Sequence, residues 1–598
     1  MSASLPVLGA RPLSLKDAVE ANAVAKRVLL VCPPFQPLVL SSLAVAQLAT
    51  LLRSHNIVCT ESYLHFDFAR LIGENKYSQI TDAGSGLKGE MLFAEGLHGT
   101  PDDTLAEQTL SQLYGPIEER ARARDALFER CFERIAADKP DLIGMSTSFN
   151  QLLPALWLSR QIKQSFPGVQ IVLGGAACSE PMGQRVLEGY ADIDYVVSGF
   201  GERPLLALGS GAPIQDRFLH GHETPDLDGL PIPEYDEFLK QAGEFADRKK
   251  ISLAFESSRG CWWGQKNHCT FCGLNGVEMR FTAKSSKRVV EEIRSLWRRH
   301  HRNLFATDTI MSREHLRTVM VDLGQFEDKP ALFYEVKSNM AESDISALKR
   351  ANATTLQPGI ESLNTHLLTL LKKGVSTIRN LALLKWGRER GLNILWNLLC
   401  AIPGEKAEDY DQQLLLIDKI PQFQPPHGVN PIRIDRFSPY FNNYADYGWE
   451  SIEPFAEYRW LHPHFDNDAL NDVAYHFNGV GGIQPGSYLK RLRGALNEWR
   501  ERFDKNDGLF LDPEQGLIRN ESGHGMRFGL APALQRIVDE THDVVPIAKV
   551  MQAASCPRAV IDQLAKAGIL YIEGEKVLNL AIRVKPPLDQ PPPDATAT

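Results

Sequence analysis

The chain is poor in cysteine and has no long apolar run. Nine cysteines in 598 residues are too few, and odd in number, for the disulfide framework of a secreted protein. No apolar run reaches the roughly 20 residues that span a bilayer, and the N-terminus has neither the charged nor the apolar region of a signal peptide. We therefore expect a cytoplasmic protein with reduced thiols and no membrane partner.

An excess of basic residues is also missing. The formal net charge is −9, from 65 lysines and arginines against 74 aspartates and glutamates, whereas nucleic-acid binding needs a concentrated basic face. The one basic cluster, Lys287–Arg302, follows a helical period, and we interpret it as the solvated face of a helix. No G-x-G-x-x-G follows the first strand, which argues against a nicotinamide dinucleotide. We expect no nucleic-acid partner.

The first third of the chain alternates apolar strands with helices. This alternation predicts a parallel sheet covered on both faces, a doubly wound Rossmann-like α/β domain. We predict helices at Ser42–Arg53 and Leu105–Asp138, and a long loop or insertion over Asp67–Thr104. The predicted strands are Arg27–Pro34, Ile57–Tyr63, Asp141–Phe149, VQIVLGGAAC and IDYVVSGFGE.

Small residues follow several of these strands. Ser146, Thr147 and Ser148 follow one strand, Gly174 and Gly175 the next, and Gly199 and Gly201 the last. Ligands of open α/β sheets bind at the carboxyl ends of the strands, where small residues let a large ligand approach the backbone. Ordinary tight turns are the alternative, and the glycines by themselves favour it.

A linker rich in Pro, Asp and Gly at Pro213–Pro233 precedes a second alternating region. Its β/α succession predicts a partial (β/α)6 barrel of the TIM type, with the active site at the carboxyl ends of the strands. Beyond about Glu450 the pattern indicates a mostly helical C-terminal domain with a winged-helix-like unit. We expect domains at 1–225, 226–449 and 450–598, with a disordered Pro-rich tail from about Pro586.

Three cysteines, Cys261, Cys269 and Cys272, lie within SSRGCWWGQKNHCTFCGLNG. Closely spaced thiolates hold Fe–S clusters, and three ligands on a four-iron cluster leave one iron open to a small molecule, which favours catalysis over electron storage. A structural zinc site needs four ligands, and His268 adjoins Cys269 too closely for a good tetrahedron. Zinc and chance spacing stay as alternatives. We interpret most of the other six cysteines as buried apolar residues.

The string RGCWWGQKNHCTFCGLNG resembles the radical S-adenosylmethionine (SAM) superfamily, although seven residues follow the first cysteine where the common pattern has three. This longer spacing is similar to that of one branch, the cobalamin-dependent radical SAM proteins that mature ribosomally made peptides. The segments FYEVKSN, LQPGIESLNTHLLTLLKKGVSTIRN, WNLLCAIPGE and RFSPY resemble the same branch. The resemblance covers roughly Arg27–Tyr447.

The resemblance implies three cofactors: a [4Fe–4S] cluster on Cys261, Cys269 and Cys272, SAM on the open iron, and cobalamin in the N-terminal domain. No D-x-H-x-x-G is present, so no lower ligand to cobalt is named. Helix caps and strand-end turns are the alternative roles for the residues that follow. The residues implied near SAM are Glu335, Lys337, Gly359, Glu361, Ser362 and Asp308. The residues implied near cobalamin are Pro34, Ser146, Thr147, Ser148, Gln151, Gly174, Gly175, Gly199, Gly201 and Glu202.

The implied activity is methylation of an unactivated carbon in a precursor peptide. The resemblance implies that a 5′-deoxyadenosyl radical removes a hydrogen atom, that methylcobalamin gives the carbon a methyl group, and that a second SAM remethylates the cobalt. A reductant such as flavodoxin or ferredoxin would supply the electron. Tyr440, beside Pro439 at a strand end, is the candidate catalytic residue in an aromatic wall that keeps water from the radical.

Two other functions compete with methylation. One keeps the same cofactors but performs cyclisation or rearrangement without methyl transfer. The other, from a different class, is an Fe–S sensor or binding module whose C-terminal unit contacts DNA, and the acidic balance of the chain argues against it. The winged-helix-like unit either grips a leader segment of the peptide or is a structural cap.

Overall fold

The computed structural model describes residues 24–82, 87–223, 225–248, 250–276, 278–482 and 486–584. These residues form two compact units. The first contains the chain up to Phe255 with Gly276–Glu278 and Glu453–Phe477, and the second contains Glu256–Asn275, Met279–Ile452 and the chain from Asn478 onward. The predicted tail from about Pro586 lies outside the described residues.

The first unit extends beyond the boundary expected near residue 225. The segment after the linker is tied to the N-terminal sheet by buried hydrogen bonds. Gln241 accepts from the Tyr63 amide (2.8 Å), and the Ala254 amide donates to the Ser41 hydroxyl (2.8 Å). These bonds satisfy groups at the sheet's edge, so the segment belongs to the first unit in space.

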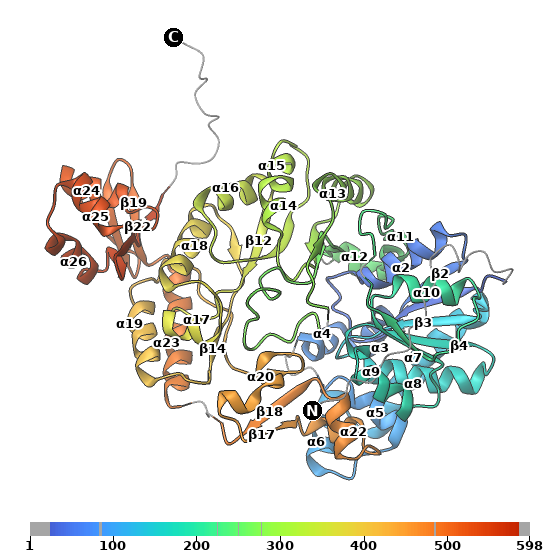
Figure 1. The fold of residues 1–598 in the computed structure, drawn as a ribbon. Coiled ribbons are helices and arrows are strands. Elements are labelled where there is room, and N and C mark those ends of the chain that lie inside the picture. The colour runs from blue at the N-terminus through green and yellow to red at the C-terminus, as the bar shows by residue number, and fades with distance from the viewer. Residues whose placement is uncertain are drawn as a thin grey trace, which may run out of the picture. The chain divides into compact units, whose positions relative to one another are not determined.

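A six-stranded parallel sheet forms the core of the first unit, in the order β2-β1-β3-β4-β5-β6 (Figure 1). The order reverses between β1 and β3, as in doubly wound folds. The first five strands confirm the predicted ones, whereas β6 lies in the segment that was expected to be a linker. Strand β1 is fully buried, which explains its unbroken apolar run. The strands of this sheet are β1 (Val28–Cys32), β2 (Cys59–Tyr63), β3 (Leu142–Ser146), β4 (Gln170–Gly174), β5 (Tyr195–Gly199) and β6 (Phe218–Gly221). A further strand, β7 (Leu253–Phe255), is not part of it.

Helices surround this sheet in two groups. Helix α2, capped by the Ser42 side chain, packs on α10, whereas α5, α7 and α8 pack on one another. This arrangement confirms the predicted parallel-sheet α/β core. The helices of the first unit are α2 (Leu43–Ser54), α3 (Leu64–Ile72), α4 (Glu74–Asp82), α5 (Met91–His98), α6 (Thr104–Tyr114), α7 (Ile117–Asp138), α8 (Leu152–Ser165), η1 (Ala176–Cys178), α9 (Met182–Gly189), α10 (Glu202–Gly209), α11 (Asp236–Ala242), α12 (Glu244–Arg248), α21 (Glu457–Leu461) and α22 (Asn467–Val473).

Two expectations for this unit were wrong. The segment Asp67–Thr104 is not a long loop, because α3, α4 and α5 occupy most of it and bury Phe66, Phe68 and Phe93. The expected helix Leu105–Asp138 is two helices, α6 and α7. It breaks at Gly115, whose positive φ of 85° suits glycine, and at Pro116, which begins a new helix.

The second unit contains a parallel β/α region, as predicted. Its main sheet runs β13-β12-β11-β10 within this unit, and β14 pairs in parallel with β15. The segment LNILWNLLC forms two strands, β13 and β14, on either side of the buried Trp396. The strands are β8 (Ser258–Arg259), β9 (Thr282–Ala283), β10 (Leu304–Ala306), β11 (Leu332–Val336), β12 (Ala353–Pro358), β13 (Asn393–Ile394), β14 (Leu398–Cys400) and β15 (Val429–Pro431).

Helices follow the strands of this region. The basic stretch Lys287–Arg302 falls largely on α13, whose apolar residues Val289, Ile293 and Leu296 are buried, as predicted for a helix with a solvated basic face. The helices are α13 (Ser286–His300), α14 (Arg313–Arg317), α15 (Val319–Gly324), α16 (Glu342–Arg350), α17 (Thr365–Leu370), α18 (Thr377–Glu389), α19 (Ala407–Ile417), α20 (Pro439–Asn442) and η2 (Tyr444–Tyr447). Three further short strands are β16 (Ile434–Asp435), β17 (Ser451–Pro454) and β18 (His476–Val480).

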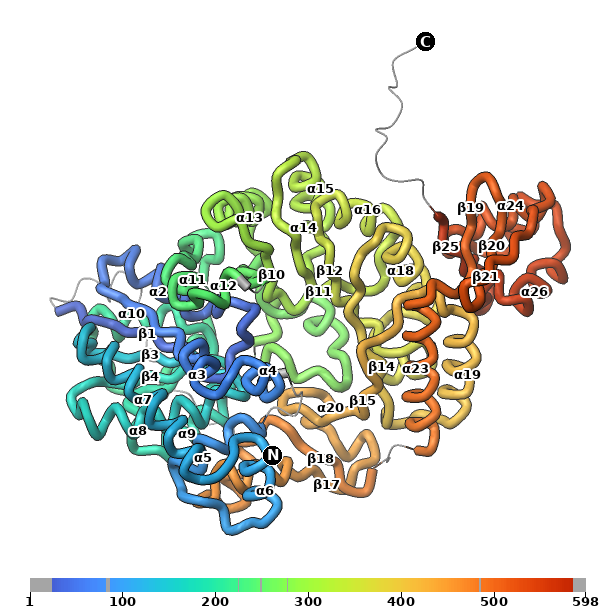
Figure 2. Tube along the Cα trace, turned by 180° about the vertical axis from the view of Figure 1, so that it is seen from behind, coloured from blue at the N-terminus to red at the C-terminus, as the bar shows by residue number. Residues whose placement is uncertain are grey.

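The chain ends in a long helix and a small mixed α/β region. Helix α23 (Tyr488–Asp504) packs along α19, and both views show the two side by side (Figures 1 and 2). The hairpins β19 (Gly508–Asp512), β20 (Gly516–Glu521) and β21 (His524–Phe528) were not predicted; they form a sheet with β25 (Ile582–Arg583).

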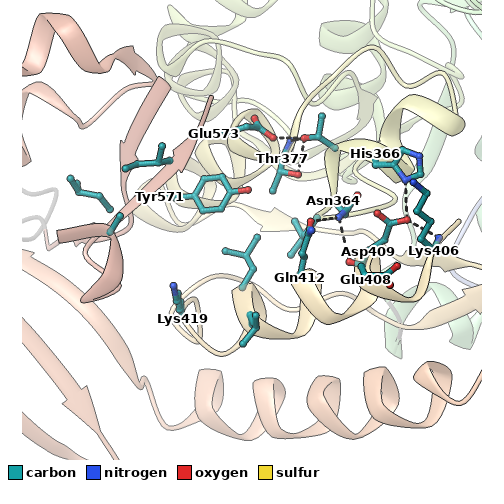
Figure 3. Close-up of a pocket in the computed structure, with 17 residues that line it drawn as sticks. Asn364, His366, Thr377, Lys406, Glu408, Asp409, Gln412, Lys419, Tyr571 and Glu573 are labelled. Carbon is teal, nitrogen blue, oxygen red and sulfur yellow. Dashed lines mark hydrogen bonds and ion pairs between the residues drawn. The ribbon is translucent and has the colours of Figure 1, made fainter. Parts of the chain in front are cut away.

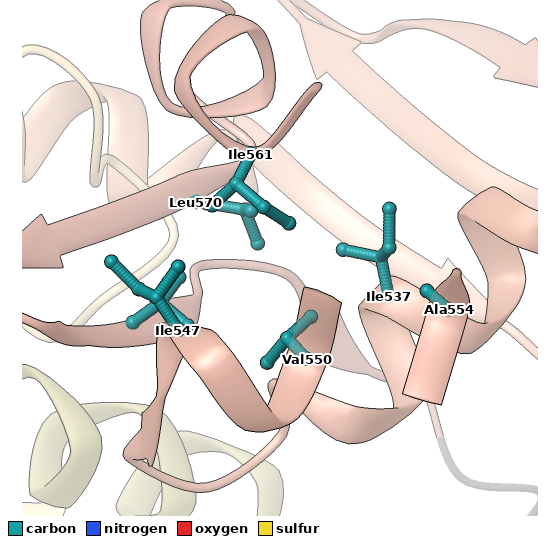
Figure 4. Close-up of a cluster of buried hydrophobic side chains, with 7 residues drawn as sticks. Ile537, Ile547, Val550, Ala554, Ile561 and Leu570 are labelled. Carbon is teal, nitrogen blue, oxygen red and sulfur yellow. The ribbon is translucent and has the colours of Figure 1, made fainter. Parts of the chain in front are cut away.

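The last residues form the winged-helix-like arrangement that the sequence predicts: helices and then a hairpin. Ile537, Val550 and Ile561, one from each of its three helices, meet in a buried apolar cluster (Figure 4). The elements are α24 (Pro532–Glu540), β22 (Val545–Pro546), α25 (Ile547–Ala554), α26 (Arg558–Lys566), β23 (Leu570–Glu573) and β24 (Lys576–Asn579). In the described part of the chain, no helix is both long and apolar enough to cross a bilayer.

Candidate cluster and cofactor site

One loop of the second unit carries the three predicted cluster ligands. Strands β8 and β9 pair antiparallel at its base, where the Cys261 amide donates to the Met279 carbonyl (3.3 Å). Cys261, Cys269 and Cys272 are each half-buried in this loop. Of the other six cysteines only Cys556 is half-buried, and the rest are buried, as expected.

The three thiols lie close enough together to affect one another electrostatically. The pKa of Cys272 is raised to about 12, chiefly by burial; the Leu274 amide lowers it, and the neighbouring thiols of Cys269 and Cys261 contribute to the rise. Burial also raises the pKa of Cys261, against the amide of Gly264, which lies 3.2 Å from its sulfur. Packed thiolates of this kind need a cation to offset their repulsion.

His268 does not complete a four-ligand set. Its Nε2 lies 2.8 Å from the backbone carbonyl of Cys272, so this ring nitrogen makes a hydrogen bond to the backbone of the loop itself. The donor set of the loop is therefore three thiolates. Three thiolates fit a four-iron cluster with one open iron, and they do not supply the four ligands of a structural zinc site.

Two tryptophans hold the loop against the β/α region. Trp262 Nε1 donates to the Met311 carbonyl (3.0 Å), and Trp263 Nε1 donates to the Lys372 carbonyl (3.2 Å). Gly374 has a positive φ of 61°, and a Cβ there would lie 2.2 Å from the Trp263 ring. The glycine therefore lets Trp263 pack closely beside the cysteines.

Beside this loop, four ionisable side chains meet. Glu335 and Lys337 project from β11, and Glu361 and Lys373 follow β12 and α17. Lys373 Nζ lies 3.2 Å from the Glu361 carboxylate. Lys337 Nζ donates to the Lys373 carbonyl and lies 3.6 Å from the centre of the Trp263 ring. The predicted pair on β11 and the predicted Glu361 therefore belong to one polar cluster.

Burial sets the protonation of this cluster. Burial and, after it, the neighbouring Glu361 raise the pKa of Glu335 to about 7, although Lys373 lowers it. Burial lowers the pKa of Lys337 to about 8, again helped by Lys373. The pKa of Lys373 is lowered by burial, but Glu361 and the Cys269 thiol outweigh that effect and raise it overall. Two carboxyl and two ammonium groups thus share one site, which suits a zwitterionic ligand.

Sequence reasoning missed Lys373. It lies in the string LLKKG, in which both lysines look like surface residues. In the structure Lys372 is exposed, whereas Lys373 is only 8% exposed. Gly359, which was predicted, has its reason here: a Cβ at this position would lie 2.4 Å from Lys373 Nζ. The sequence itself carries no signal that separates Lys373 from the exposed Lys372.

Two other predicted SAM residues lie deeper. Asp308 accepts from the Ser257 amide (2.7 Å) and from the hydroxyls of Ser257 (2.5 Å) and Ser258 (2.6 Å). Ser362 donates to Gln413 (3.1 Å) and accepts from the Asn364 amide (3.1 Å). Both side chains are buried, so these bonds position the backbone just before the cysteine loop and just after β12.

Tyr440 lies on the short helix α20, after the end of β16. Its amide donates to the carbonyl of Thr270 (2.9 Å), which is in the cysteine loop between Cys269 and Cys272. The ring is buried and packs edge-to-face on Tyr447 and Trp449. Burial raises the pKa of its hydroxyl. The residue adjoins the loop, as an aromatic wall residue would.

In the first unit, the predicted strand-end residues meet at the carboxyl edge of the sheet. Thr147 donates through its amide to the Gly174 carbonyl (2.7 Å), and Gln151 donates to the Pro33 carbonyl (2.8 Å) and accepts from the Ser148 hydroxyl (2.9 Å). The loops after β1, β3 and β4 are therefore interlocked. Ser146, Pro34 and the buried Glu202 lie at the same edge.

The backbone conformation explains why glycine stands at two positions of this edge. Gly175 has φ of 114°, and a Cβ there would lie 2.3 Å from the Thr147 carbonyl oxygen. Gly199 has φ of 91°, and a Cβ there would lie 2.8 Å from the Gly221 carbonyl oxygen. Gly174 and Gly201 have room for a Cβ. The tight-turn explanation is therefore sufficient for Gly175 and Gly199, and it leaves the surface beside Gly174 and Gly201 open to a ligand.

A separate groove of about 1020 Å³ lies between α19, the start of α17 and β23 (Figure 3). None of its lining residues belongs to the cysteine loop. Tyr571 projects into it, Glu573 is held by Thr365, and Asp409 is held by His366 (2.9 Å) on the opposite side. Its remaining charged groups are Lys406, Glu408 and Lys419.

Comparison with known proteins identifies the central region. Residues 255–417 match the radical SAM superfamily and form a radical SAM domain, a domain type that uses a [4Fe–4S] cluster and SAM. This match contains all three cysteines and the polar cluster of Glu335, Lys337, Glu361 and Lys373.

One curated relative and two solved structures are similar over longer stretches. An uncharacterized methyltransferase of Pyrococcus horikoshii is 23% identical over 321 residues, which are 50% of this chain and 68% of the relative. The radical SAM methyltransferase TsrM of Kitasatospora setae, solved with cobalamin and a [4Fe–4S] cluster, matches with a TM-score of 0.51 and 16% identity over 80% of this chain and 91% of that one. The cobalamin-dependent radical SAM enzyme OxsB, solved with aqua-cobalamin and SAM, has a TM-score of 0.47 and 14% identity; the match covers 80% of this chain but only 61% of OxsB. The fold is therefore that of radical SAM proteins with an N-terminal α/β unit.

Proposed function

From the radical SAM domain at residues 255–417, we propose that this protein is a cobalamin-dependent radical SAM methyltransferase acting on an unactivated carbon of a ribosomally made precursor peptide. The observation that carries the proposal is the set of three half-buried thiols in one loop, with His268 turned to a carbonyl and the Glu361–Lys373 pair beside them. Methyltransferase names among the relatives support the methyl transfer.

The chain's own residues have definable roles in such a reaction. Cys261, Cys269 and Cys272 would hold the cluster. Lys337 and Lys373 offer ammonium groups to the carboxylate of SAM, and Glu335 and Glu361 offer carboxyl groups to its amino group. When bound, the cluster and SAM supply the hydrogen-abstracting radical, and cobalamin supplies the methyl group.

The remaining task of the protein is to exclude water and competing hydrogen donors. Trp262 and Trp263, within the cysteine loop, and Tyr440, whose amide donates to the Thr270 carbonyl of that loop, supply aromatic surface beside the cysteines. The carboxyl edge of the N-terminal sheet, at Ser146–Gln151 and Gly174, is the proposed place for cobalamin, because ligands of open α/β sheets bind at such edges.

We propose the groove beside β23 as the site where the precursor peptide is held. Strand β23 is the outer strand of the described sheet β22-β24-β23, and outer strands accept extended peptides by strand addition. Tyr571 supplies an aromatic wall, and Lys406 and Lys419 line the groove together with Glu408, Asp409 and Glu573, so it offers charges of both signs. A labelled candidate precursor peptide tests the site: Tyr571→Ala should weaken binding roughly tenfold, whereas Phe528→Ala, an exposed aromatic on β21, should not.

Product mass tests the reaction. Reconstituted protein with SAM, methylcobalamin, a flavodoxin or ferredoxin reductant and the peptide should give a product heavier by one CH₂. Cyclisation or rearrangement, the second candidate, gives a product that has lost hydrogens or kept its mass. Deoxyadenosine release with no methylated peptide would reject methyl transfer, and the absence of any SAM cleavage would leave only a sensor or binding module.

A further inference from the structure

Two histidines and two carboxylates converge at the end of the last strand of the N-terminal sheet. Their ligand atoms are nitrogen and oxygen, whereas the cysteine loop offers sulfur. His220 Nδ1 lies 3.0 Å from His222 Nε2. Glu180 Oε2 lies 4.0 Å from His220 Nδ1. The distance between the two imidazole nitrogens is close to the separation of about 3.3 Å between ligands that share a tetrahedral zinc ion with bonds of about 2.0–2.1 Å. The three residues offer donor atoms within 4.8 Å of one another, so the Glu180 carboxylate has to approach further to bind the same ion.

The fold brings these side chains together from separate elements. His220 is on β6, and His222 follows two residues later, so both project from the same side of the strand. Ser198 of β5 is the register partner of His220, and its hydroxyl accepts from the Glu180 amide (3.0 Å). The backbone of Glu180 is therefore fixed beside His220 by the neighbouring strand.

A fourth side chain orients the cluster. His222 Nδ1 lies 2.7 Å from the Glu278 carboxylate, so it donates a hydrogen bond to Glu278. The Nε2 of the same ring is then the unprotonated nitrogen, and it faces His220 and Glu180. A carboxylate behind the distal nitrogen of a histidine is the usual outer partner of a metal-binding imidazole.

We propose that Glu180, His220 and His222 bind one divalent first-row transition metal ion, with Glu278 orienting His222. Two imidazoles and one carboxylate are ligands for zinc, iron, cobalt or nickel, whereas magnesium and calcium prefer oxygen alone. The two carboxylates of the cluster match the charge of a divalent ion. Glu223, which follows His222, is paired with Arg203 and lies outside the set.

Without a metal, the same geometry is a hydrogen-bond chain in which His220 donates to His222 and His222 donates to Glu278. The two explanations differ in what they predict for zinc. The proposed site does not depend on the radical SAM reaction, so it is tested by binding and not by activity.

The experiment is a zinc titration of the full-length, anaerobically reconstituted protein in competition with a chromophoric chelator. We expect about one zinc ion per chain. Replacing His222 by Ala should weaken zinc binding by roughly 100-fold or more, because it removes a direct ligand, and Glu278→Gln by roughly 10–100-fold, the range for an outer partner. His524→Ala, an exposed histidine on β21, is the matched control and should bind zinc like the wild type.

X-ray absorption at the zinc edge identifies the ligands. Nitrogen and oxygen neighbours at about 2.0–2.1 Å support the site, whereas sulfur at about 2.3 Å would assign the zinc to cysteines and overturn the proposal. Equal zinc affinity in the wild type and in the His220→Ala/His222→Ala double variant would also overturn it. Iron content and circular dichroism, measured on every variant, establish that the cluster loop and the fold are unchanged.

Discussion

Lys373 places its ammonium group 3.2 Å from the Glu361 carboxylate, with side chains only 10% and 19% exposed. The pair lies beside Cys269 and Cys272, whose thiols also raise the pKa of Lys373. A largely buried ion pair is costly to form unless other groups complete it. We infer that a charged ligand completes the pair. The neighbours Glu335 and Lys337 add one acidic and one basic group, which can bind a ligand that carries both charges.

Replacing Lys373 by Met should weaken SAM binding roughly 30-fold, about 2 kcal/mol, because the variant leaves the Glu361 carboxylate buried without its partner. Equilibrium dialysis of labelled SAM against the reconstituted protein measures this change. The matched control is Lys372→Met, which removes the same charge from an exposed neighbour. Equal SAM affinity in both variants would remove Lys373 from the site.

Replacing Cys261, Cys269 or Cys272 by Ala should each abolish stable cluster binding, because a cluster of four irons held by two thiolates exchanges with solvent. The expected iron content falls from about four per chain to a small fraction of that value, with loss of the charge-transfer absorption. Cys556→Ala, half-buried and far along the sequence, should retain full iron. A single loop variant with full iron and sulfide would mean that the loop is not the cluster site.

The sequence was sufficient for the elements whose signal is local. The buried strand β1 is an unbroken apolar run, the helix α13 has periodic apolar residues, and the three cysteines are identified by their spacing. Helices α3 to α5 were missed because their apolar residues, such as Phe66 and Phe93, are interrupted by charged residues and glycines whose partners lie elsewhere in the chain. Burial of those rings, Phe66 against Phe238 and Phe93 against Phe68 and Trp157, makes these helices, not propensity.

The candidate site shows the same difference between local sequence signals and contacts that depend on packing. Glu335 and Lys337 could be predicted because they share one strand end. Lys373 and the Glu180–His220–His222 set could not, because their members come together only when separate loops pack. Ser362 and Asp308 make local hydrogen bonds that hold the backbone, and their contact with SAM stays a prediction. Sequence alone does not distinguish a residue that contacts a ligand from one that positions its neighbour.

Lys385 anchors the winged-helix-like region to helix α18. Its buried Nζ donates to the carbonyls of His542 and Asn579 (both 3.1 Å) and to the Asn579 side chain (2.8 Å). Lys385→Met leaves these buried acceptors unpaired, at a cost of about 1–3 kcal/mol for each unsatisfied group. We expect faster limited proteolysis of the region after α23, with unchanged iron content. Lys549→Met, an exposed lysine in the same region, is the control; equal protection of both variants would contradict the anchoring role.

Glu90 should make the stability of the first unit depend on pH. Burial raises its pKa to about 8, only partly offset by the amides of Leu153 and Leu152, and its carboxylate accepts from Leu153 N at 3.0 Å. Because the pKa is raised on folding, the folded state holds the proton more tightly than the unfolded chain does. Stability from this group is full below about pH 4.5 and is lost as the pH rises to about 8.

Glu90→Gln keeps the acceptor for Leu153 and removes the titration. Relative to the wild type, the variant should gain stability between pH 5 and pH 9, by at most about 5 kcal/mol at about 1.4 kcal/mol per pKa unit. Peptide-resolved hydrogen exchange of α5 and α8, with variant and wild type compared at each pH, measures the gain locally. Glu133→Gln, an exposed carboxyl on α7, should show no such trend. A constant difference between Glu90→Gln and wild type across this range would mean that Glu90 is ionised in the folded protein throughout, and that the Leu152 and Leu153 amides stabilise its charge more than burial destabilises it.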